Sequence, residues 1–306
     1  MSFQKKHILD IGSLSIDEIT HILDTADTMK EISERPVKKV PILKGKTIIL
    51  FFHEPSTRTK VSFDIAAKRL SADSISISSS GSSMVKGETL IDTGRNLQAM
   101  NPDIVVMRHS SSGASNILSK ALDTSVINAG DGMHAHPSQS LLDMMSIREI
   151  KGDLKGLKVA MIGDIAHSRV ARSNMEGLRK MGAQVIISGP PTMIPIGIES
   201  YGVKVTYDVN EAVKDADVII MLRIQKERQE NFLFSTEREY SKTYGLSLEK
   251  LQQADSDVLI MHPGPMNRGV EITNEVADGP YSIILDQVKN GVALRMALFY
   301  LLAGGS

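Results

Sequence analysis

The chain has 306 residues, with 35 Lys and Arg against 36 Asp and Glu, and it contains no cysteine. At about 150 residues per domain, this length predicts two domains. The balanced charge disfavours nucleic-acid binding, and the absence of cysteine excludes disulfides, a thiolate nucleophile and Cys-ligated metals. Residues 1–6 run into a polar, amphipathic stretch without the apolar region of a secretory signal, and the longest apolar run, 292–303, is shorter than the roughly 20 residues that cross a bilayer. We therefore expect a cytoplasmic protein with no membrane partner.

The first predicted element is a helix over residues 15–33, with Ser15 as its N-cap and Glu18 completing a capping box. Short apolar, β-branched runs then alternate with segments of helical period, such as 60–70 and 88–100. This alternation is typical of parallel sheets with crossover helices. The predicted strands form two sets: residues 47–52, 74–78, 104–108 and 125–128, then 157–162, 184–188, 203–206, 218–222 and 258–261.

The sequence therefore predicts an α/β protein with two doubly wound domains, each a parallel sheet flanked by helices, and an active-site cleft between them. Residues 137–149 are expected to form a connecting helix with proline at its first position, followed by a polar stretch. The first domain is expected to cover residues 1–136, completed by a C-terminal helix over 291–306. The second is expected to cover 150–290. The serine-rich patch 74–83 is interpreted as a mobile loop after a short strand.

The sharpest local feature is the run Ser56-Thr57-Arg58-Thr59, which follows a buried strand and Pro55 and opens a helix. Unsatisfied N–H groups and the positive dipole end make a helix N-terminus favourable for an anion. Three hydroxyls and a planar guanidinium exceed what a cap needs, and they suit phosphate or carboxylate. The alternative is an ordinary N-cap beside a surface arginine.

Two further polar groups follow later strands of the first half. Arg108 comes at the end of a strand and should lie at the same sheet edge as Arg58, unless it forms only a surface salt bridge. A glycine-rich turn then leads to His136 before a proline and to Gln139 in the first helical turn. His134 and His136 have too few neighbouring ligands for a metal site, so an imidazole that donates to a ligand oxygen is favoured over a metal ligand. A purely structural histidine is the other alternative.

The second half carries its own anion-binding candidates. Gly163-Asp164 ends a strand and Arg169 opens the following helix, but the glycine spacing of a dinucleotide-binding turn is missing. Arg223 and Gln225 alternate just past another strand and share one side. Together with Lys86 in the serine-rich loop, these groups predict two facing anion pockets, for a phosphate-bearing donor and a carboxylate-bearing acceptor.

Seven blocks of the chain, in order, resemble the catalytic chains of the aspartate carbamoyltransferase family, and the resemblance covers essentially the whole length. The blocks are Ser56-Thr57-Arg58-Thr59, Lys86-Gly-Glu-Thr, Met-Arg108-His, Asn-Ala-Gly-Asp-Gly-x-x-x-His136-Pro-x-Gln139, Gly163-Asp164 with Arg169, Arg223-x-Gln225-x-Glu-Arg, and His262-Pro-x-Pro265. The segment 133–135 departs from the family pattern, so the resemblance implies no role for His134.

The resemblance implies a transferase that moves the carbamoyl group of carbamoyl phosphate to the amine of L-aspartate, giving N-carbamoyl-L-aspartate and phosphate in de novo pyrimidine biosynthesis. The residues it assigns to carbamoyl phosphate are Ser56, Thr57, Arg58, Thr59, Arg108, His136, Gln139, Gly264 and Pro265. Those it assigns to aspartate are Lys86, Arg169, Arg223 and Gln225. The catalytic set is Arg58, Thr59, His136 and Lys86. No cofactor and no metal are implied.

The resemblance also implies a homotrimer with shared active sites, in which Ser82 and Lys86 come from the neighbouring subunit. Family members occur as bare trimers, with regulatory chains, or assembled with dihydroorotase, and the sequence does not select among these.

Two other functions stay open. A carbamoyltransferase for another amino acid such as ornithine is one, although the chain lacks the cysteine loop and the Ser-Met-Gly block usual in that branch. A non-enzymatic two-lobed anion-binding protein is the other, but it does not explain His136 and Gln139 beside a phosphate site.

Overall fold

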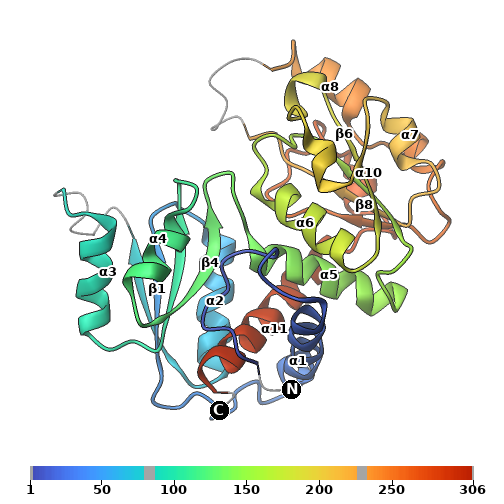
Figure 1. The fold of residues 1–306 in the computed structure, drawn as a ribbon. Coiled ribbons are helices and arrows are strands. Elements are labelled where there is room, and N and C mark those ends of the chain that lie inside the picture. Colours follow the sequence, from blue (N-terminus) through green and yellow to red (C-terminus); the bar gives the residue numbers. More distant parts are fainter. Residues whose placement is uncertain (1–2, 79–86, 226–232, 305–306) are drawn as a thin grey trace. The chain divides into compact units, whose positions relative to one another are not determined.

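The computed structural model describes residues 3–78, 87–225 and 233–304, and its chain divides into two compact units. The first unit comprises Met1–Met145 with Lys289–Ser306, and the second comprises Ser146–Val288. Helix α5 (Pro137–Lys151) carries the chain into the second unit and α11 (Ile284–Ala303) carries it back (Figure 1). Each unit is a parallel sheet flanked by helices, which confirms the predicted fold class. The assignment of one substrate to each unit stays a prediction.

Helix α1 (Ile16–Glu34) begins as the sequence predicts. The Glu18 N–H donates to Ser15 Oγ at 3.1 Å, and the Ser15 N–H donates to Glu18 Oε2 at 2.8 Å. This reciprocal capping box satisfies two amides that the first turn would otherwise leave without partners. The buried side of the helix consists of Ile19, Ile22, Leu23, Ala26, Met29 and Ile32.

The sheet of the first unit has the strand order β2-β1-β3-β4, and all of its pairings are parallel. Its strands are β1 (Thr47–Phe52), β2 (Asp73–Ser78), β3 (Ile104–His109) and β4 (Ser125–Asp131). Its crossover helices are α2 (Thr57–Arg69), α3 (Leu90–Ala99) and α4 (Ala114–Ala121). Helices α3 and α4 cover one face, while α2 and α11 cover the other (Figure 1). This two-sided covering follows from right-handed crossovers, because the chain moves one way across the sheet from β1 to β2 and the opposite way from β2 to β3 and from β3 to β4.

The outer edge of β4 is paired with the N-terminal segment. The Ile8 N–H donates to the Val126 carbonyl at 2.9 Å, and the Asn128 N–H donates to the Ile8 carbonyl at 2.8 Å. Covering an edge strand in this way removes a row of exposed backbone groups that could pair with another chain.

The sheet of the second unit has the order β7-β6-β5-β8-β9 and is also parallel throughout. Its strands are β5 (Lys158–Ile162), β6 (Gln184–Ser188), β7 (Lys204–Thr206), β8 (Val218–Met221) and β9 (Leu259–Met261). Its α-helices are α6 (Arg169–Lys180), α7 (Val209–Val213), α8 (Glu237–Tyr244), α9 (Leu248–Leu251) and α10 (Asn274–Ala277). Side chains of α7, α9 and α10 pack in one core with β5, β8 and β9, and α6 lies on the opposite face (Figure 1).

The ends of some elements differ from the sequence-based expectation and others agree with it. Helix α2 begins at Thr57 with Ser56 as its N-cap, as expected from the prediction that the Ser-Thr-Arg-Thr run opens a helix. Strand β4 continues to Asp131, past the predicted end at 128, and pairs there with His109. In the serine-rich patch, residues 73–78 form β2, and the loop predicted after it lies outside the described residues.

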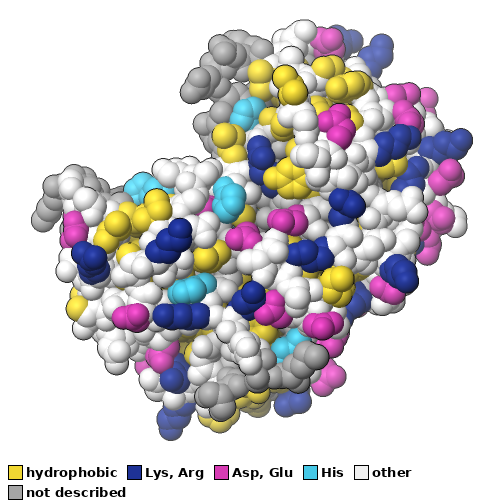
Figure 2. Space-filling view, in the orientation of Figure 1, with side chains coloured by type: hydrophobic (Ala, Val, Ile, Leu, Met, Phe, Trp, Pro, Cys, Tyr) yellow, Lys and Arg dark blue, Asp and Glu magenta, His cyan; other side chains and the backbone are white. Residues whose placement is uncertain are grey.

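The described helices, in residues 3–78, 87–225 and 233–304, include none with both the length and the apolar character needed to cross a bilayer. Figure 2 shows Lys and Arg side chains interspersed with Asp and Glu over the visible face, without a continuous field of one sign. This mixture agrees with the formal net charge of -1.

Candidate active site

The predicted residues of the first unit lie where the carboxyl ends of β1, β3 and β4 meet. Because β2 and β3 lie on opposite sides of β1, the sheet has its topological switch point between β1 and β3, where ligands bind in folds of this class. Backbone hydrogen bonds join the loops there. The His53 N–H donates to the Arg108 carbonyl at 2.8 Å, and the Gly132 N–H donates to the His109 carbonyl at 2.9 Å. The structure thus brings the β1, β3 and β4 loops together.

The Ser-Thr-Arg-Thr run forms the start of α2 at this switch point. Ser56 is the N-cap in extended conformation, yet its side chain makes no capping hydrogen bond. Thr57 and Arg58 are exposed, whereas Thr59 is buried. The Ser56 hydroxyl is therefore not used as an ordinary cap, which agrees with the anion-binding interpretation of this turn.

Arg108 forms a largely buried ion pair that the sequence analysis missed. Its Nη2 donates to Glu54 Oε1 at 2.6 Å, and its Nη1 donates to the Ala129 carbonyl at 3.2 Å. Only 11 % of the Arg108 side chain and 21 % of the Glu54 side chain are exposed, so this is not the surface salt bridge considered above. Glu54 holds the guanidinium in place and reduces the net positive charge at this edge. The position of Glu54 directly before Pro55, next to the Ser-Thr-Arg-Thr run, was the sequence signal from which this ion pair could have been predicted.

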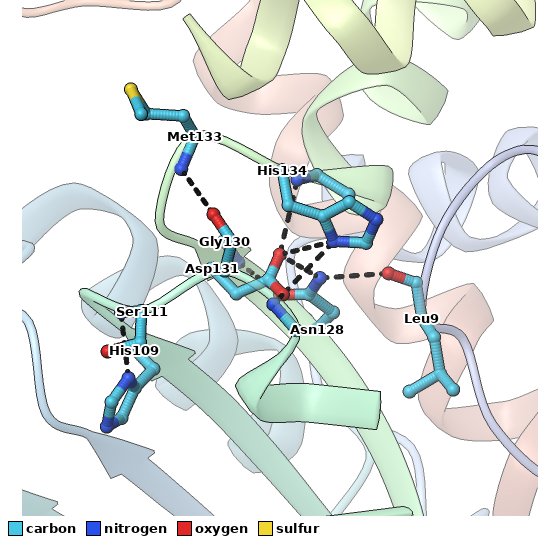
Figure 3. Close-up of polar contacts among 11 residues, drawn as sticks. Leu9, His109, Ser111, Asn128, Gly130, Asp131, Met133 and His134 are labelled. Atoms are coloured by element: carbon cyan, nitrogen blue, oxygen red, sulfur yellow. Dashed lines mark hydrogen bonds and ion pairs between the residues drawn. The ribbon is translucent and has the colours of Figure 1, made fainter. Parts of the chain in front are cut away.

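A buried carboxylate, Asp131, closes the turn that leads to His136 (Figure 3). It accepts hydrogen bonds from the Gly113 N–H at 2.7 Å, from Asn128 Nδ2 at 2.8 Å and from the Ala135 N–H at 3.2 Å. His134 Nδ1 lies 3.1 Å from both carboxylate oxygens. His134, for which the sequence implied no role, therefore helps to fix this turn.

His136 and Gln139 flank the start of α5. The His136 side chain is buried, and its Nδ1 lies 3.5 Å from Ser138 Oγ. Gln139 Nε2 donates to Asp143 Oδ1 at 2.9 Å, one helical turn further on. Among the described residues, no three His, Asp or Glu side chains form a group that could hold a metal ion.

His53 and His109 stack against each other beside this turn, with ring centroids 4.4 Å apart and planes 20° apart. Burial and then the neighbouring His53 lower the pKa of His109. The Ser111 N–H donates to His109 Nδ1 at 2.9 Å (Figure 3), so the neutral ring carries its proton on Nε2. The stack was not predicted, because the two residues lie far apart in sequence.

In the second unit, the predicted residues follow β5 and β8, again at a switch point, because β6 and β8 flank β5 on opposite sides. Gly163 has φ 133°, and a Cβ there would lie 2.6 Å from the Leu222 carbonyl oxygen. Only glycine allows the two loops to approach this closely. The buried Asp164 then accepts from the Gln225 N–H at 3.1 Å and lies 2.8 Å from His167 Nδ1.

The two arginines predicted for this unit occupy different environments. Arg169 is the first residue of α6 and is only 3 % exposed. Arg223 is partly exposed, and its Nη2 donates to Gln225 Oε1 at 3.0 Å. The structure therefore brings Arg223 and Gln225 together, as their spacing predicts.

The turn after β9 is held by a buried histidine. The Gly264 N–H donates to His262 Nδ1 at 2.7 Å, and His262 Nε2 lies 3.2 Å from Glu271 Oε1. Gly264 has φ 65°, and the Gly264–Pro265 peptide bond is cis. The last two predicted residues, Ser82 and Lys86, lie outside the described residues.

Comparison with known proteins matches both halves of the chain to one family. Residues 6–149 match the carbamoyl-P binding domain of aspartate/ornithine carbamoyltransferases, and residues 155–302 match their Asp/Orn binding domain.

Relatives and solved structures agree with this over the full length. The aspartate carbamoyltransferase catalytic subunit of Desulforapulum autotrophicum is 69 % identical over 100 % of this chain and 98 % of its own. The ornithine carbamoyltransferase structure from Pyrococcus furiosus is 31 % identical, with a TM-score of 0.88 over 100 % of this chain and 99 % of its own. Trypanosoma cruzi aspartate transcarbamoylase with carbamoyl aspartate and phosphate is 27 % identical, with a TM-score of 0.86 over 98 % and 96 %. With both domains matched in order along one chain, the protein belongs to the aspartate/ornithine carbamoyltransferase family.

Proposed function

We propose that the protein transfers the carbamoyl group from carbamoyl phosphate to the amine of L-aspartate, giving N-carbamoyl-L-aspartate and phosphate. The observation that carries this proposal is the 69 % identity over the full chain to a relative named as an aspartate carbamoyltransferase catalytic subunit. The grouping of hydroxyl, guanidinium and imidazole groups at the β1–β3 switch point supports it independently, because these are the donors that a phosphate and a carbonyl oxygen need.

In the first unit, we assign the phosphate to Ser56, Thr57, Arg58 and Thr59 at the start of α2, together with Arg108. The helix N-terminus and the guanidinium groups neutralise the phosphate as it leaves. Three side chains contact the carbamoyl oxygen: Arg58, Thr59 and His136. Gln139 of this unit, together with the backbone at Gly264 and Pro265 of the second unit, contacts the carbamoyl amino group in this assignment.

In the second unit, we assign the aspartate carboxylates to Arg169, Arg223 and Gln225. The hydrogen bond from Arg223 to Gln225 supports a joint role for these two side chains, because it orients the guanidinium fork. Lys86 is proposed as a further cation for aspartate and as a catalytic residue, and both Ser82 and Lys86 are proposed to come from the neighbouring subunit.

The chemistry follows from these groups without a covalent enzyme intermediate. The aspartate nitrogen attacks the carbamoyl carbon, and negative charge builds on the carbamoyl oxygen, which the preset donors stabilise. The bond to the phosphate oxygen then breaks with its electron pair, and the phosphate takes the proton that the amine loses. Positioning and charge stabilisation therefore account for the reaction, and no cofactor is proposed.

Ornithine is the alternative acceptor, because the structural neighbour from Pyrococcus furiosus is named an ornithine carbamoyltransferase. The test is to incubate the purified chain with carbamoyl phosphate and either L-aspartate or L-ornithine, and to measure the ureido product by colorimetry. We expect product with aspartate only. Product with ornithine alone would overturn the proposed acceptor but retain the reaction class.

The homotrimer with shared sites, the cytoplasmic location and the place in pyrimidine biosynthesis belong to the same proposal. The whole-chain resemblance to catalytic subunits supports them. A sedimentation mass, measured alone and with added dihydroorotase, distinguishes a bare trimer from a larger assembly.

A further inference from the structure

The amide of Gln139 is held in one orientation by a carboxylate of its own helix. Gln139 Nε2 donates to Asp143 Oδ1 at 2.9 Å, and Asp143 is completely buried. An ionised carboxylate only accepts hydrogen bonds, so it selects the NH₂ end of the amide. The other end, the carbonyl oxygen Oε1, then points away from Asp143.

A buried guanidinium on α11, that of Arg295, lies near enough to Asp143 for the carboxylate to favour its charged form. Arg295 is 3 % exposed, and its Nη1 donates to Ser62 Oγ at 3.1 Å and to the Gly291 carbonyl at 2.8 Å. Burial lowers the pKa of Arg295 to about 10, against the opposing effect of the Asp143 carboxylate, so the guanidinium is charged at neutral pH. Two opposite charges buried near each other each favour the ionised form of the other.

The fold makes room for this guanidinium. A Cβ at position 291 would lie 2.6 Å from Arg295 Nη1, so the glycine one helical turn before Arg295 leaves the space that the group occupies. The Phe63 ring covers it on another side, with 4.8 Å between the ring centroid and Cζ. None of these residues belongs to the proposed substrate contacts apart from Gln139.

We propose that Asp143 and Arg295 are positioning residues, which fix the Gln139 amide so that its carbonyl oxygen accepts from the carbamoyl amino group. This inference rests on the proposed function and deepens it. The carbamoyl carbon carries a donor, NH₂, and an acceptor, oxygen, and a pocket that distinguishes them needs an acceptor fixed on one side. Without the buried charges, the amide can rotate and present its own NH₂ group, which repels that of the substrate.

Acetyl phosphate is the probe that isolates this effect, because it keeps the phosphate and the carbonyl oxygen and replaces the amino group with a methyl group. The experiment measures the affinities of wild-type protein and the Asp143→Asn variant for carbamoyl phosphate and for acetyl phosphate by calorimetry. An asparagine amide can donate as well as accept, so it no longer selects one orientation of Gln139. We expect carbamoyl phosphate to bind about tenfold more weakly and acetyl phosphate to keep its affinity within about twofold.

Equal weakening of both ligands, or no weakening of either, overturns the inference, because a merely structural role cannot distinguish an amino group from a methyl group. Wild-type protein that binds no carbamoyl phosphate contradicts the proposed function, and the inference falls with it. If Asp143→Asn leaves the ratio of the carbamoyl phosphate affinity to the acetyl phosphate affinity at its wild-type value, the inference alone is contradicted.

Two further variants complete the test. Ser62→Ala removes another partner of Arg295 without removing a charge, and we expect both affinities to stay within about twofold; a selective loss here would contradict the specific role of Asp143. Gln139→Met keeps the buried pair and removes the amide, so it should lose the same selectivity. This second variant also decides the matter if Asp143→Asn does not fold, since selectivity retained in Gln139→Met overturns the inference.

Discussion

Buried or largely buried carboxylates hold several of the polar side chains proposed to act on substrate, or the loops that carry them. Glu54 pairs with Arg108, and Asp131 closes the turn before His136. In the second unit, Asp164 accepts from the backbone beside Arg223. A buried charge is tolerated only when it is paired or hydrogen-bonded, so each acid restricts the loop that bonds to it. Preorganisation of the site therefore depends on acids that touch no substrate in the proposed mechanism.

Arg58→Ala should remove most of the activity while the fold stays intact, because Arg58 is exposed and serves both the phosphate and the carbamoyl oxygen in the proposed mechanism. Loss of one preorganised donor costs about 10²–10³ in kcat, and a charged donor costs more. Steady-state kinetics on the purified variant, with circular dichroism as the fold control, checks this. A variant that kept a tenth of the wild-type kcat would contradict the role.

Arg223→Ala should act on the other substrate. We expect a large rise in the KM for aspartate, with the affinity for carbamoyl phosphate alone little changed, because Arg223 belongs to the second unit. Calorimetry with each ligand separates the two effects. Equal weakening of the binding of both ligands would contradict the assignment of Arg223 to aspartate.

The stacked pair His53 and His109 makes stability depend on pH. The pKa of His109 is lowered in the folded chain, so the folded state disfavours its protonated form. Its contribution to stability is present above the unfolded pKa of about 6.5 and is lost as the pH falls toward the lowered folded pKa. In His53→Phe the coulombic part of the shift disappears, so the pKa of His109 should rise. An NMR titration of the ring protons measures it, and an unchanged value would argue against the pairing.

Among the elements, the sequence predicted regular structure better than it predicted contacts. Strands β1 and β6 have the predicted bounds, because their apolar runs are short and bounded by polar residues. The Ser15 capping box was also predictable, because all of it lies within one turn. The Arg108–Glu54 pair and the Arg295–Ser62 contact were not, since they join residues 54 and 233 positions apart. The periodicity of apolar residues indicates which face of an element is buried, but it does not indicate which residues pack against that face.

Ser15→Ala should destabilise the first unit by about 1 kcal/mol, because the Glu18 N–H loses its acceptor at the N-terminus of α1. Urea denaturation followed by circular dichroism measures the change. Ser13→Ala is the matched control, since its hydroxyl makes only a 3.4 Å contact with the Asp10 carbonyl. The capping role would be refuted if both variants had the same unfolding midpoint as the wild type.

For the whole molecule, both units repeat one plan: a parallel sheet whose switch point carries arginine beside polar side chains. The site residues predicted from the sequence follow the strands next to these switch points, because parallel strands present their carboxyl ends at one edge. The proposed completion of one chain's site by a loop of another does not follow from the periodicity of the sequence, since assembly depends on surfaces.

Hybrid oligomers test the proposed shared site. Arg58→Ala and Lys86→Ala homo-oligomers should each be nearly inactive. After dissociation and random reassembly of an equimolar mixture, some sites should combine an intact Arg58 with an intact Lys86 of the neighbouring chain, and activity should approach roughly a quarter of wild type. Enzyme assays on the whole reassembled mixture provide the measurement. Verified hybrids without any recovery would show that both residues act within one chain.

The return of the chain through α11 affects the order in which the protein is completed during synthesis. The core of the first unit contains Phe299 against Phe63, and Arg295 bonds to Ser62, so helix α2 acquires these partners only when the final residues are made. The second unit, Ser146–Val288, is by contrast one uninterrupted stretch of chain. As the ribosome releases the chain from its N-terminus, the second unit has all of its residues available while the first still lacks its closing helix. The first unit is therefore the first to be synthesised and the last to be completed. The side of α2 that contacts α11 stays uncovered in the interval.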